Sequence, residues 1–144
     1  MNYHIRPMTL DDHEEAFRLW ANVEGVDLGD DDNRDRLRIY LDRNSGLCFV
    51  AIKGEEIVGT ILCGHDGRRG ILRHLAVDEA HRKKGIARAL VQESLAALAK
   101  EGIEKCNVFV LESNAEGLRF WQHLGFHILE NNYLTLQHAT GAAT

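Results

Sequence analysis

The residues with the clearest chemical potential form a short cationic segment at the start of a helix. Arg82, Lys83 and Lys84 lead directly into Gly85 and then into a helix rich in alanine and leucine, predicted over residues 86–100. The N-terminal end of a helix already carries unpaired N–H groups and a partial positive charge. Additional cations there are unfavourable unless an anion binds beside them. The pattern therefore predicts an anion-binding site.

The spacing Arg82-x-x-Gly85-x-Ala87 differs from the common phosphate-binding loops. Small residues at 85 and 87 let a bulky anion approach the backbone, and the N–H groups of residues 83–87 can converge on it. The P-loop pattern GxxxxGK[ST] and the dinucleotide-binding pattern GxGxxG after a first strand are both absent. Alone, this segment is also consistent with a solvated basic turn, so the anion has to be identified from the surrounding motifs.

The charge distribution argues against a nucleic-acid-binding surface. The net charge is −5, and residues 11–35 hold ten Asp or Glu against two Arg, whereas residues 68–88 hold seven Lys or Arg against two acidic residues. The basic stretch has no interleaved aromatic residues on which bases could stack. The sequence instead predicts one patch that receives an anion and one that tolerates a cation.

Length and composition predict one globular domain. The chain has 144 residues, of which 44% are hydrophobic and 27% charged. No apolar run approaches the ~20 residues of a membrane-spanning helix, and no signal-peptide pattern is present. Cys48, Cys63 and Cys106 are odd in number and widely spaced, and the histidines are scattered. We therefore expect reduced thiols, a cytoplasmic location, no metal ion and no membrane partner.

The elements that position the cationic segment follow from hydrophobic periodicity and turn signals. Strands are predicted at 3–7, 47–52, 57–64, 71–77 and 105–111, helices at 9–23, 33–43, 86–100 and 115–124, and a last hairpin at 126–130 and 133–137 around Asn131-Asn132. The order β-α-α-β-β-β-α-β-α-β-β predicts a single α/β domain of the α+β type over residues 1–137. Residues 138–144 are expected to form a disordered tail.

Two motifs in sequence order resemble the GCN5-related N-acetyltransferases, with details closest to small bacterial members of unassigned substrate. "LRHLAV" and "RKKGIA" precede the long helix, and "VFVLESN" and "GLRFWQHLGF" follow it. The resemblance covers roughly residues 3–137, and residues 75–126 carry the motifs. The matching positions are Arg82, Gly85 and Ala87 in the first motif, and Asn114, Phe120, Leu124, Gly125 and Phe126 in the second.

This resemblance implies acetyl transfer from acetyl-CoA, a co-substrate, to an amine, without a metal ion. It also implies the family's mixed, mostly antiparallel sheet of about seven strands and about four helices. The end of the strand 71–77 would bind the pantetheine amides as an added strand is held. The resemblance assigns each part of acetyl-CoA to a group of residues. The pantetheine amides would bind Leu75, Ala76 and Val77, and the pyrophosphate would bind Arg82, Lys83, Lys84, Gly85, Ile86 and Ala87. Lys83, Lys84 or Arg88 would contact the 3′-phosphate, Asn114 the pantetheine arm, and Phe120 the adenine or the arm.

The sequence departs from the family at the residue that commonly protonates the leaving thiolate. A tyrosine is usual there, but this chain has Trp121, whose indole N–H is not an acid. Either another group, such as Tyr133 or water, protonates the thiolate, or the chain is a non-catalytic acyl-CoA-binding or regulatory module. Two residues are candidates for the general base, His74 and Glu112. Each also has a structural explanation, as a strand-edge histidine and as a helix-capping carboxylate.

The acidic segment from Glu24 to Asp35 lies where the family gathers its acceptor. It predicts a cationic amine on a small molecule or a peptide, although Asp30 to Asp32 also suit the capping of the second helix. The sequence does not identify this amine. It also leaves open whether the chain forms a homodimer and whether acyl groups other than acetyl are used.

Overall fold

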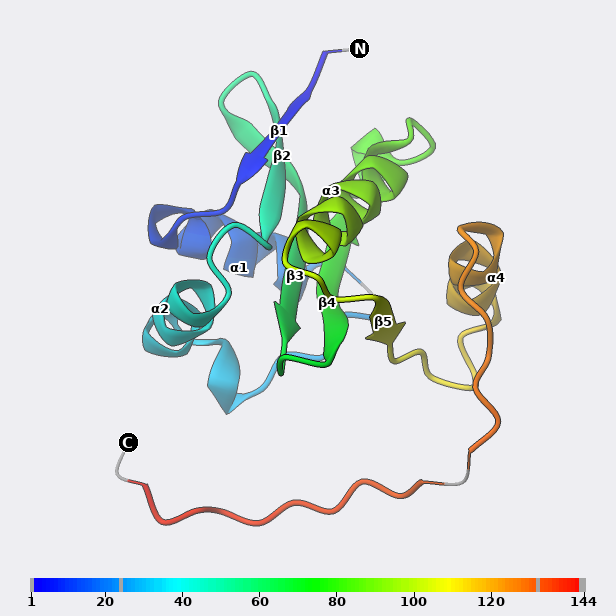
Figure 1. Ribbon diagram of the computed structural model, residues 1–144. Coiled ribbons are helices and arrows are strands. Elements are labelled where there is room, and N and C mark those ends of the chain that lie inside the picture. The colour runs from blue at the N-terminus through cyan, green and yellow to red at the C-terminus, as the bar shows by residue number, and fades with distance from the viewer. Residues whose placement is uncertain (1, 24, 132, 143–144) are drawn as a thin grey trace.

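The computed structural model describes residues 2–23, 25–131 and 133–142, and a five-stranded sheet lies at its centre (Figure 1). The sheet order follows the chain: β1 (His4–Pro7), β2 (Phe49–Lys53), β3 (Glu56–His65), β4 (Arg69–Val77) and β5 (Lys105–Val108). The first four strands are antiparallel neighbours, and β5 is parallel to β4. The predicted α+β class with a mixed, mostly antiparallel sheet is confirmed.

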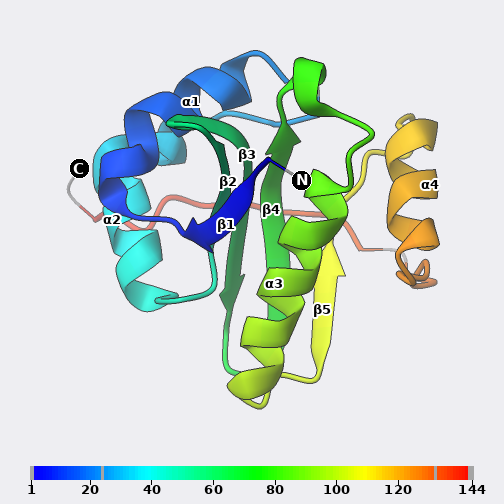
Figure 2. The same cartoon turned by 90° about the horizontal axis from the view of Figure 1, so that it is seen from above.

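Helices cover both faces of this sheet. Figure 2 shows α1 (His13–Ala21) and α2 (Arg34–Arg43) on one side, α3 (Ile86–Lys100) on the other, and α4 (Ala115–His123) beyond β5. The predicted first helix is instead a 3₁₀ turn, η1 (Leu10–Asp12), followed by the shorter α1, and two more 3₁₀ turns are η2 (Asp30–Asp32) and η3 (Glu79–His81).

The alternation of side chains along the strands builds two cores. In β2, Phe49 and Ala51 pack in the cluster that includes α3, whereas Val50 and Ile52 pack in the cluster that includes α1 and α2. Because both faces are covered, β2 and β3 are buried along almost their whole length. Gly70 lets α3 approach β4 closely, since a Cβ at this position would lie 2.5 Å from Leu98.

A bulge in β4 interrupts the regular register. Thr60 of β3 pairs with Ala76, and Leu62 pairs with Arg73, so two residues of β4, His74 and Leu75, lie opposite a single residue of β3. His74 has a φ of +51°, in the left-handed region that residues other than glycine seldom adopt. A bulge of this kind re-aims a side chain out of the strand's alternation.

Strands β4 and β5 pair over four residues only. Arg69–Leu72 pair with Lys105–Val108, and the chain then leaves β4 through residues 109–114. The predicted strand 105–111 is therefore shorter than expected. Residues 73–77 of β4 consequently have no strand on their β5 side within the described residues, and this unpaired stretch begins one residue before the bulge.

The predicted C-terminal hairpin is absent from the part of the chain that the structure describes. Residues 127–131 and 133–142 contain no strand and are exposed throughout, while Asn132 of the predicted turn lies outside the described residues. Figure 1 shows this segment leaving α4 and passing below the sheet without pairing. A two-stranded ribbon is marginally stable unless a face of it packs against other structure. The expectation of strands at 126–130 and 133–137 was therefore wrong, and the sheet has five strands in place of about seven.

Asp12 joins β1 to the start of α1. Its carboxylate accepts two hydrogen bonds of 2.8 Å from the guanidinium of Arg6 and one of 2.8 Å from the backbone N–H of Thr9. The side chain is almost completely buried. Burial favours the neutral acid, but the hydrogen bonds from Arg6 and Thr9 outweigh it. The pKa of Asp12 therefore lies below its ordinary value of 3.8.

We expect Asp12→Asn to lower the free energy of unfolding by about 1–3 kcal/mol at neutral pH, because it leaves the Arg6 guanidinium without its carboxylate. A depressed folded-state pKa means that this contribution is present above the ordinary pKa and is lost as the pH falls through the folded-state value. Urea unfolding should show the two proteins converging in stability under acid conditions. The exposed neighbour, in Asp11→Asn, is the control, and a difference that persisted in acid would contradict this account.

Candidate functional site

The loop before α3 has the geometry of an anion-binding site. Lys83 and Gly85 adopt left-handed conformations, with φ values of +62° and +81°, so the backbone curls just before the helix. Within the described residues, the N–H groups of residues 83–87 have no hydrogen-bond acceptor. Ile86 is buried and fixes the helix start to the core. Successive N–H groups in such a curl, at the positive end of a helix, form a concave site for an anion.

Arg82 fastens this loop to the end of β4. Its Nε donates a hydrogen bond of 3.2 Å to the carbonyl oxygen of Val77. Beside the loop lies a hollow of about 350 Å³ that brings together Lys53, Lys84 and His81 with Asn2, Tyr3 and Ile86. Lys83, Lys84 and Arg88 are all exposed, so the predicted cations are accessible to a ligand at this loop.

The unpaired side of β4 provides a second binding element next to the loop. Leu75 is half-buried, and Ala76 and Val77 are buried, yet no strand pairs with residues 73–77 on the β5 side of the described structure. Phe109, just past β5, is exposed, and the Arg73 guanidinium lies 5.7 Å from the centre of its ring. A ligand with successive amide groups can bind such a backbone edge as an added strand.

His74 stands at the bulge beside this edge and is held by a carboxylate. Its Nε2 lies 2.6 Å from Oδ1 of Asp32, and the two side chains are only 13% and 10% exposed. The ring of Trp20 packs edge-on at 4.8 Å. The hydroxyl of Thr60 accepts a hydrogen bond from Trp20 Nε1 and donates one to the carbonyl oxygen of His74, at 2.8 and 2.9 Å.

The carboxylate of Asp32 determines which nitrogen of the His74 imidazole is free to accept a proton. An ionised Asp32 can only accept, so Nε2 of His74 donates, and in the neutral ring Nδ1 then keeps its lone pair. Within the described residues, Nδ1 of His74 has no hydrogen-bond partner. It is also not fully buried, because the one fully buried side-chain nitrogen or oxygen without a partner there is Nδ1 of His81. Nδ1 of His74 therefore reaches the surface. An imidazole oriented by a carboxylate, with its other nitrogen open, is the arrangement of a general base.

The partnership of His74 and Asp32 was not predicted from the sequence. The two residues are 42 positions apart, and the acidic residues around Asp32 gave no signal that one of them differs from the rest. In the structure Asp32 is distinct because its Oδ2 also accepts from the backbone N–H of Gly29 at 2.8 Å, and its carbonyl oxygen lies 2.9 Å from Nε2 of His13.

The remaining acidic residues of this segment do not cap α2. The cap is Asn33, whose Oδ1 accepts from the N–H of Arg36 at 2.9 Å. The capping explanation of Asp30 to Asp32 was therefore wrong for α2. Glu24 lies outside the described residues, and the exposed acidic residues of the segment are Asp27, Asp30, Asp31 and Asp35.

Helix α4 carries the second predicted motif. Asn114 caps it, because its Oδ1 accepts from the N–H of Gly117 at 2.9 Å, and this leaves the side-chain amide N–H groups of Asn114 for a ligand. Trp121 is buried between the rings of Phe120 and Phe126, whose centres lie 5.2 and 5.0 Å away. A core aromatic thus occupies the position where the family commonly has its proton donor.

The structure does not bring the other two catalytic candidates to His74. Glu112 is exposed in the link between β5 and α4. Tyr133 is 85% exposed in the segment after α4. Neither makes a hydrogen bond with His74 in the part of the chain that the structure describes. Both roles stay predictions.

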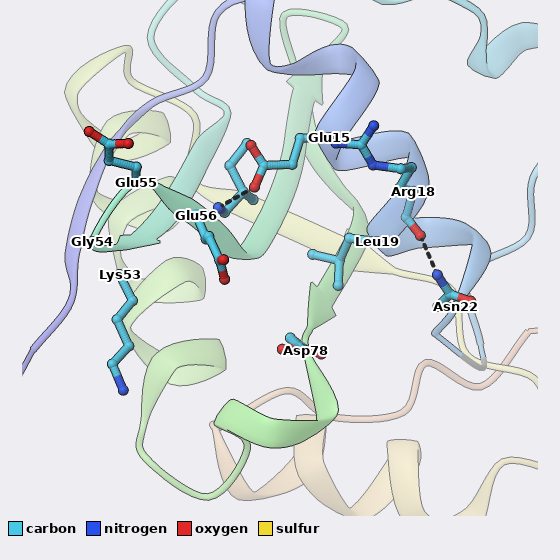
Figure 3. Close-up of a pocket in the computed structure, with 10 residues that line it drawn as sticks. Glu15, Arg18, Leu19, Asn22, Lys53, Gly54, Glu55, Glu56 and Asp78 are labelled. Atoms are coloured by element: carbon cyan, nitrogen blue, oxygen red, sulfur yellow. Dashed lines mark hydrogen bonds between the residues drawn. The ribbon is translucent and has the colours of Figure 1, made fainter.

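A larger hollow of about 890 Å³ lies between α1, the β2–β3 turn and the end of β4 (Figure 3). The charged residues that line it are Glu15, Glu55, Glu56 and Asp78, against Arg18 and Lys53. Glu15 has a structural role, since its Oε2 accepts from the N–H of Ile57 at 2.7 Å and joins α1 to β3. None of the predicted acetyl-CoA ligands lines this hollow, so it is a separate feature.

The cysteines are free thiols. Cys48 and Cys63 are buried and Cys106 is half-buried. Burial raises the pKa of Cys48 and of Cys106 to about 11, and it raises the pKa of Cys63 as well. Among the described residues, no group of His, Cys, Asp or Glu side chains is gathered to bind a metal ion, and no helix has the length and apolar character to cross a membrane.

Two solved structures illustrate the likeness of this fold to known proteins. Ard1 from Thermoplasma volcanium has a TM-score of 0.79 and 20% identity, with 90% of this chain and 86% of that chain covered. AAC(6′)-Iy, in complex with the bisubstrate analogue CoA-S-monomethyl-acetylneamine, has a TM-score of 0.77 and 17% identity, with 96% and 100% covered. At these identities, the likeness shows the fold.

Sequence comparison shows the family. Acetyltransferase SG1711 of Sodalis glossinidius (strain morsitans) is 31% identical over 127 residues, which are 88% of this chain and 89% of that protein. The model of the "Acetyltransferase (GNAT) family" matches residues 8–126. These two matches show that the chain belongs to the GNAT family and is an acyltransferase that acetylates an amine.

Proposed function

We propose that this GNAT acetyltransferase transfers the acetyl group of acetyl-CoA to a cationic primary amine, on a small molecule or a peptide, in a ternary complex. The observation that carries the proposal is the continuity of three features along one stretch of chain. These are His74 at the bulge, the open backbone edge of residues 75–77 and the free N–H groups of residues 83–87. They match, in order, an amine, a pantetheine arm with its amides and a pyrophosphate.

The donor site follows from the same features. The free N–H groups of the loop receive the pyrophosphate, and the exposed Lys83, Lys84 and Arg88 are available for the 3′-phosphate. Residues 75–77 bind the pantetheine amides, with the amide of Asn114 and the half-buried ring of Phe120 on α4 as further contacts. The likeness to AAC(6′)-Iy, which binds a CoA-linked analogue, supports this assignment.

His74 acts as the general base in this proposal. Its open Nδ1 takes a proton from the substrate ammonium, directly or through water, and Asp32 orients the ring and stabilises the imidazolium. The freed amine then attacks the thioester carbon, so that a C–N bond forms and the C–S bond breaks. Backbone N–H groups at the open edge of β4 stabilise the oxyanion. The nitrogen gives up a second proton to water as the amide forms. Since Trp121 cannot supply a proton, the departing thiolate takes one from water or another group.

The acceptor approaches past the exposed carboxylates of the segment before α2. Asp27, Asp30, Asp31 and Asp35 lie close in sequence to Asp32, which contacts His74 directly, so a cationic amine attracted to them arrives near the base. We also place the activity in the cytoplasm, where free thiols such as those of Cys48 and Cys63 persist.

A screen for thiol release from acetyl-CoA tests the proposed reaction. Polyamines, aminoglycosides, free amino acids and peptides are the acceptor classes, and release above the background without acceptor identifies the substrate. Binding of acetyl-CoA without thiol release from any of these classes would contradict the proposal in favour of a binding module.

Gly85→Glu should abolish the stabilisation that acetyl-CoA gives, because a carboxylate in the loop repels the pyrophosphate. A ligand at 100 times its dissociation constant adds about 2.7 kcal/mol to the stability of the wild type, which thermal unfolding detects. Gly102→Glu is a matched control, since Gly102 also has a φ of +81° and open space around its Cβ position, but lies at the other end of α3. Equal loss of the ligand effect in both variants would remove the loop from the donor site.

His74→Ala should lower kcat by about 10²–10⁴-fold, the usual contribution of a positioned base, with little change in the KM for acetyl-CoA. Asp32→Asn should also lower kcat, because an amide no longer fixes the ring with Nδ1 open. Raising the pH should partly restore both variants, since the solution then supplies the neutral amine. The exposed Asp42, changed to Asn, is the control. A His74→Ala variant with the wild-type kcat would contradict the role of His74 as the base and would leave Glu112 as the candidate.

Changing Asp27 and Asp31 to Asn should raise the KM for a cationic acceptor and leave the KM for acetyl-CoA unchanged. Attraction by exposed carboxylates weakens with salt, since the Debye length falls from ~10 Å at 0.1 M to ~3 Å at 1 M. The difference from the wild type should therefore shrink at high ionic strength. Steady-state kinetics at the two salt concentrations measures this, and an unchanged acceptor KM with only a lower melting temperature would assign these residues to folding.

A further inference from the structure

Arg73 lies next to the proposed base, on the same face of the sheet. It pairs with Leu62 across β4 and β3, and Leu62 packs in the core cluster that includes α1 and α2. Directly paired residues of antiparallel strands point to the same face, so the side chain of Arg73 also lies on the α1 and α2 face. The ring of His74 packs against Trp20, a member of the same cluster. The guanidinium and the imidazole are therefore neighbours.

An aromatic ring holds the guanidinium at the place where β4 and β5 part. Its central carbon lies 5.7 Å from the ring centre of Phe109, the first residue after β5. From there the chain turns away from β4 toward α4 (Figure 1). A guanidinium stacked on an aromatic face keeps the N–H groups of its own plane for a planar anion such as a carboxylate. Arg73 is exposed, and within the described residues no ion pair involves it.

The donor does not supply an anion at this place. The free N–H groups proposed for the pyrophosphate belong to residues 83–87, and the open edge of residues 75–77 separates them from Arg73 along the chain. The acetyl end of acetyl-CoA is uncharged, because a thioester carries no ionisable group. An anion that binds Arg73 beside the base therefore comes from the acceptor.

We propose that Arg73 binds a carboxylate of the acceptor, so that the acetylated amine belongs to a free amino acid, an inference that rests on the proposed function. Arg73 and His74 are consecutive, with Cα atoms about 3.8 Å apart, so the ammonium and the carboxylate lie close together on one small molecule. The exposed carboxylates of the segment before α2 attract the ammonium, and Arg73 binds the anion. An amino acid carries both charges at a short separation.

Matched acceptors test the carboxylate directly. The free amino acids are screened first, and the best of them is compared with the amine that its decarboxylation gives. The wild type should favour the amino acid by about 10- to 100-fold in kcat/KM, the range expected of hydrogen bonds between charged groups. A chain that acetylates polyamines, aminoglycosides or peptides but no free amino acid would overturn the proposal.

Arg73→Ala should remove this preference by raising the KM for the amino acid, with little change in the KM for acetyl-CoA. The comparison with the wild type cancels the intrinsic difference in reactivity between the two amines. Arg73→Lys, which keeps the charge but loses the planar guanidinium, should have an intermediate preference. Arg69→Ala is the matched control, since Arg69 is also an exposed arginine of β4. Loss of the preference in both alanine variants, or in neither, would contradict the assignment.

An acyl group with its own carboxylate is the other anion that Arg73 can reach. Succinyl-CoA, given together with the decarboxylated amine, distinguishes this case. We expect acetyl-CoA to be the better donor for the wild type and for Arg73→Ala alike. Transfer from succinyl-CoA that Arg73→Ala selectively abolishes would assign the carboxylate to the donor and overturn the proposal.

Titration calorimetry separates this inference from the proposed function. Protein saturated with CoA cannot transfer an acetyl group, so the heat reports only the binding of the amino acids and of their decarboxylated amines. Tighter binding of the amino acid, lost in Arg73→Ala, supports the carboxylate site even if the wild type releases no thiol from acetyl-CoA, and in that case only the proposed function fails. Equal binding of the two members of every pair would overturn the carboxylate site whatever the turnover.

Discussion

The bulge at His74 and Leu75 is the constraint on which the rest of the site depends. It begins two residues after Leu72, the last residue of β4 that pairs with β5, so the strand loses one neighbour close to the point where its register with the other shifts. The left-handed conformation of His74 costs about 1–3 kcal/mol, which the surroundings must offset. In return, the imidazole is turned toward α1 and η2, and the backbone beyond it is left open for a ligand.

Contacts from three separate elements maintain this conformation. Thr60 of β3 binds the carbonyl oxygen of His74, Trp20 of α1 packs against the ring, and Asp32 of η2 binds its Nε2. The three elements are also linked to one another, since the Thr60 hydroxyl accepts a hydrogen bond from the indole N–H of Trp20. Buried polar groups that satisfy one another in this way hold a single arrangement, because losing one partner leaves another unsatisfied.

The two faces of the sheet have different roles around β4. On one face, α3 begins at the anion-binding loop and lies close to the strand because Gly70 has no side chain. On the other, α1 and η2 hold the imidazole. The cationic loop and the acidic segment thus belong to opposite layers, and β4 lies between them. In the proposed reaction an anionic donor and a cationic acceptor meet at this strand from the two layers.

The sequence by itself determined the features that depend on neighbouring residues. Helix α3 begins and ends where its periodicity and its flanking glycines predict, and the loop before it has the curled backbone that Gly85 permits. The family motifs lie in the same region, so the residues proposed to bind the donor are ones that the sequence itself indicated. Such signals are local, since a helix turn, a cap and a loop are decided within a few residues.

Only the tertiary structure decided which distant residues meet. His74 was a candidate base in the sequence, but its partner Asp32 is 42 residues away and looked like any other member of an acidic run. The C-terminal segment shows the same limit, because its apolar alternation predicted strands that the single chain does not form. An alternation of apolar and polar residues indicates that a segment can pack in a sheet. A strand forms, however, only where the edge of another strand is within reach. Pairing is non-local, and that is why the fold, and not the sequence pattern, settles it.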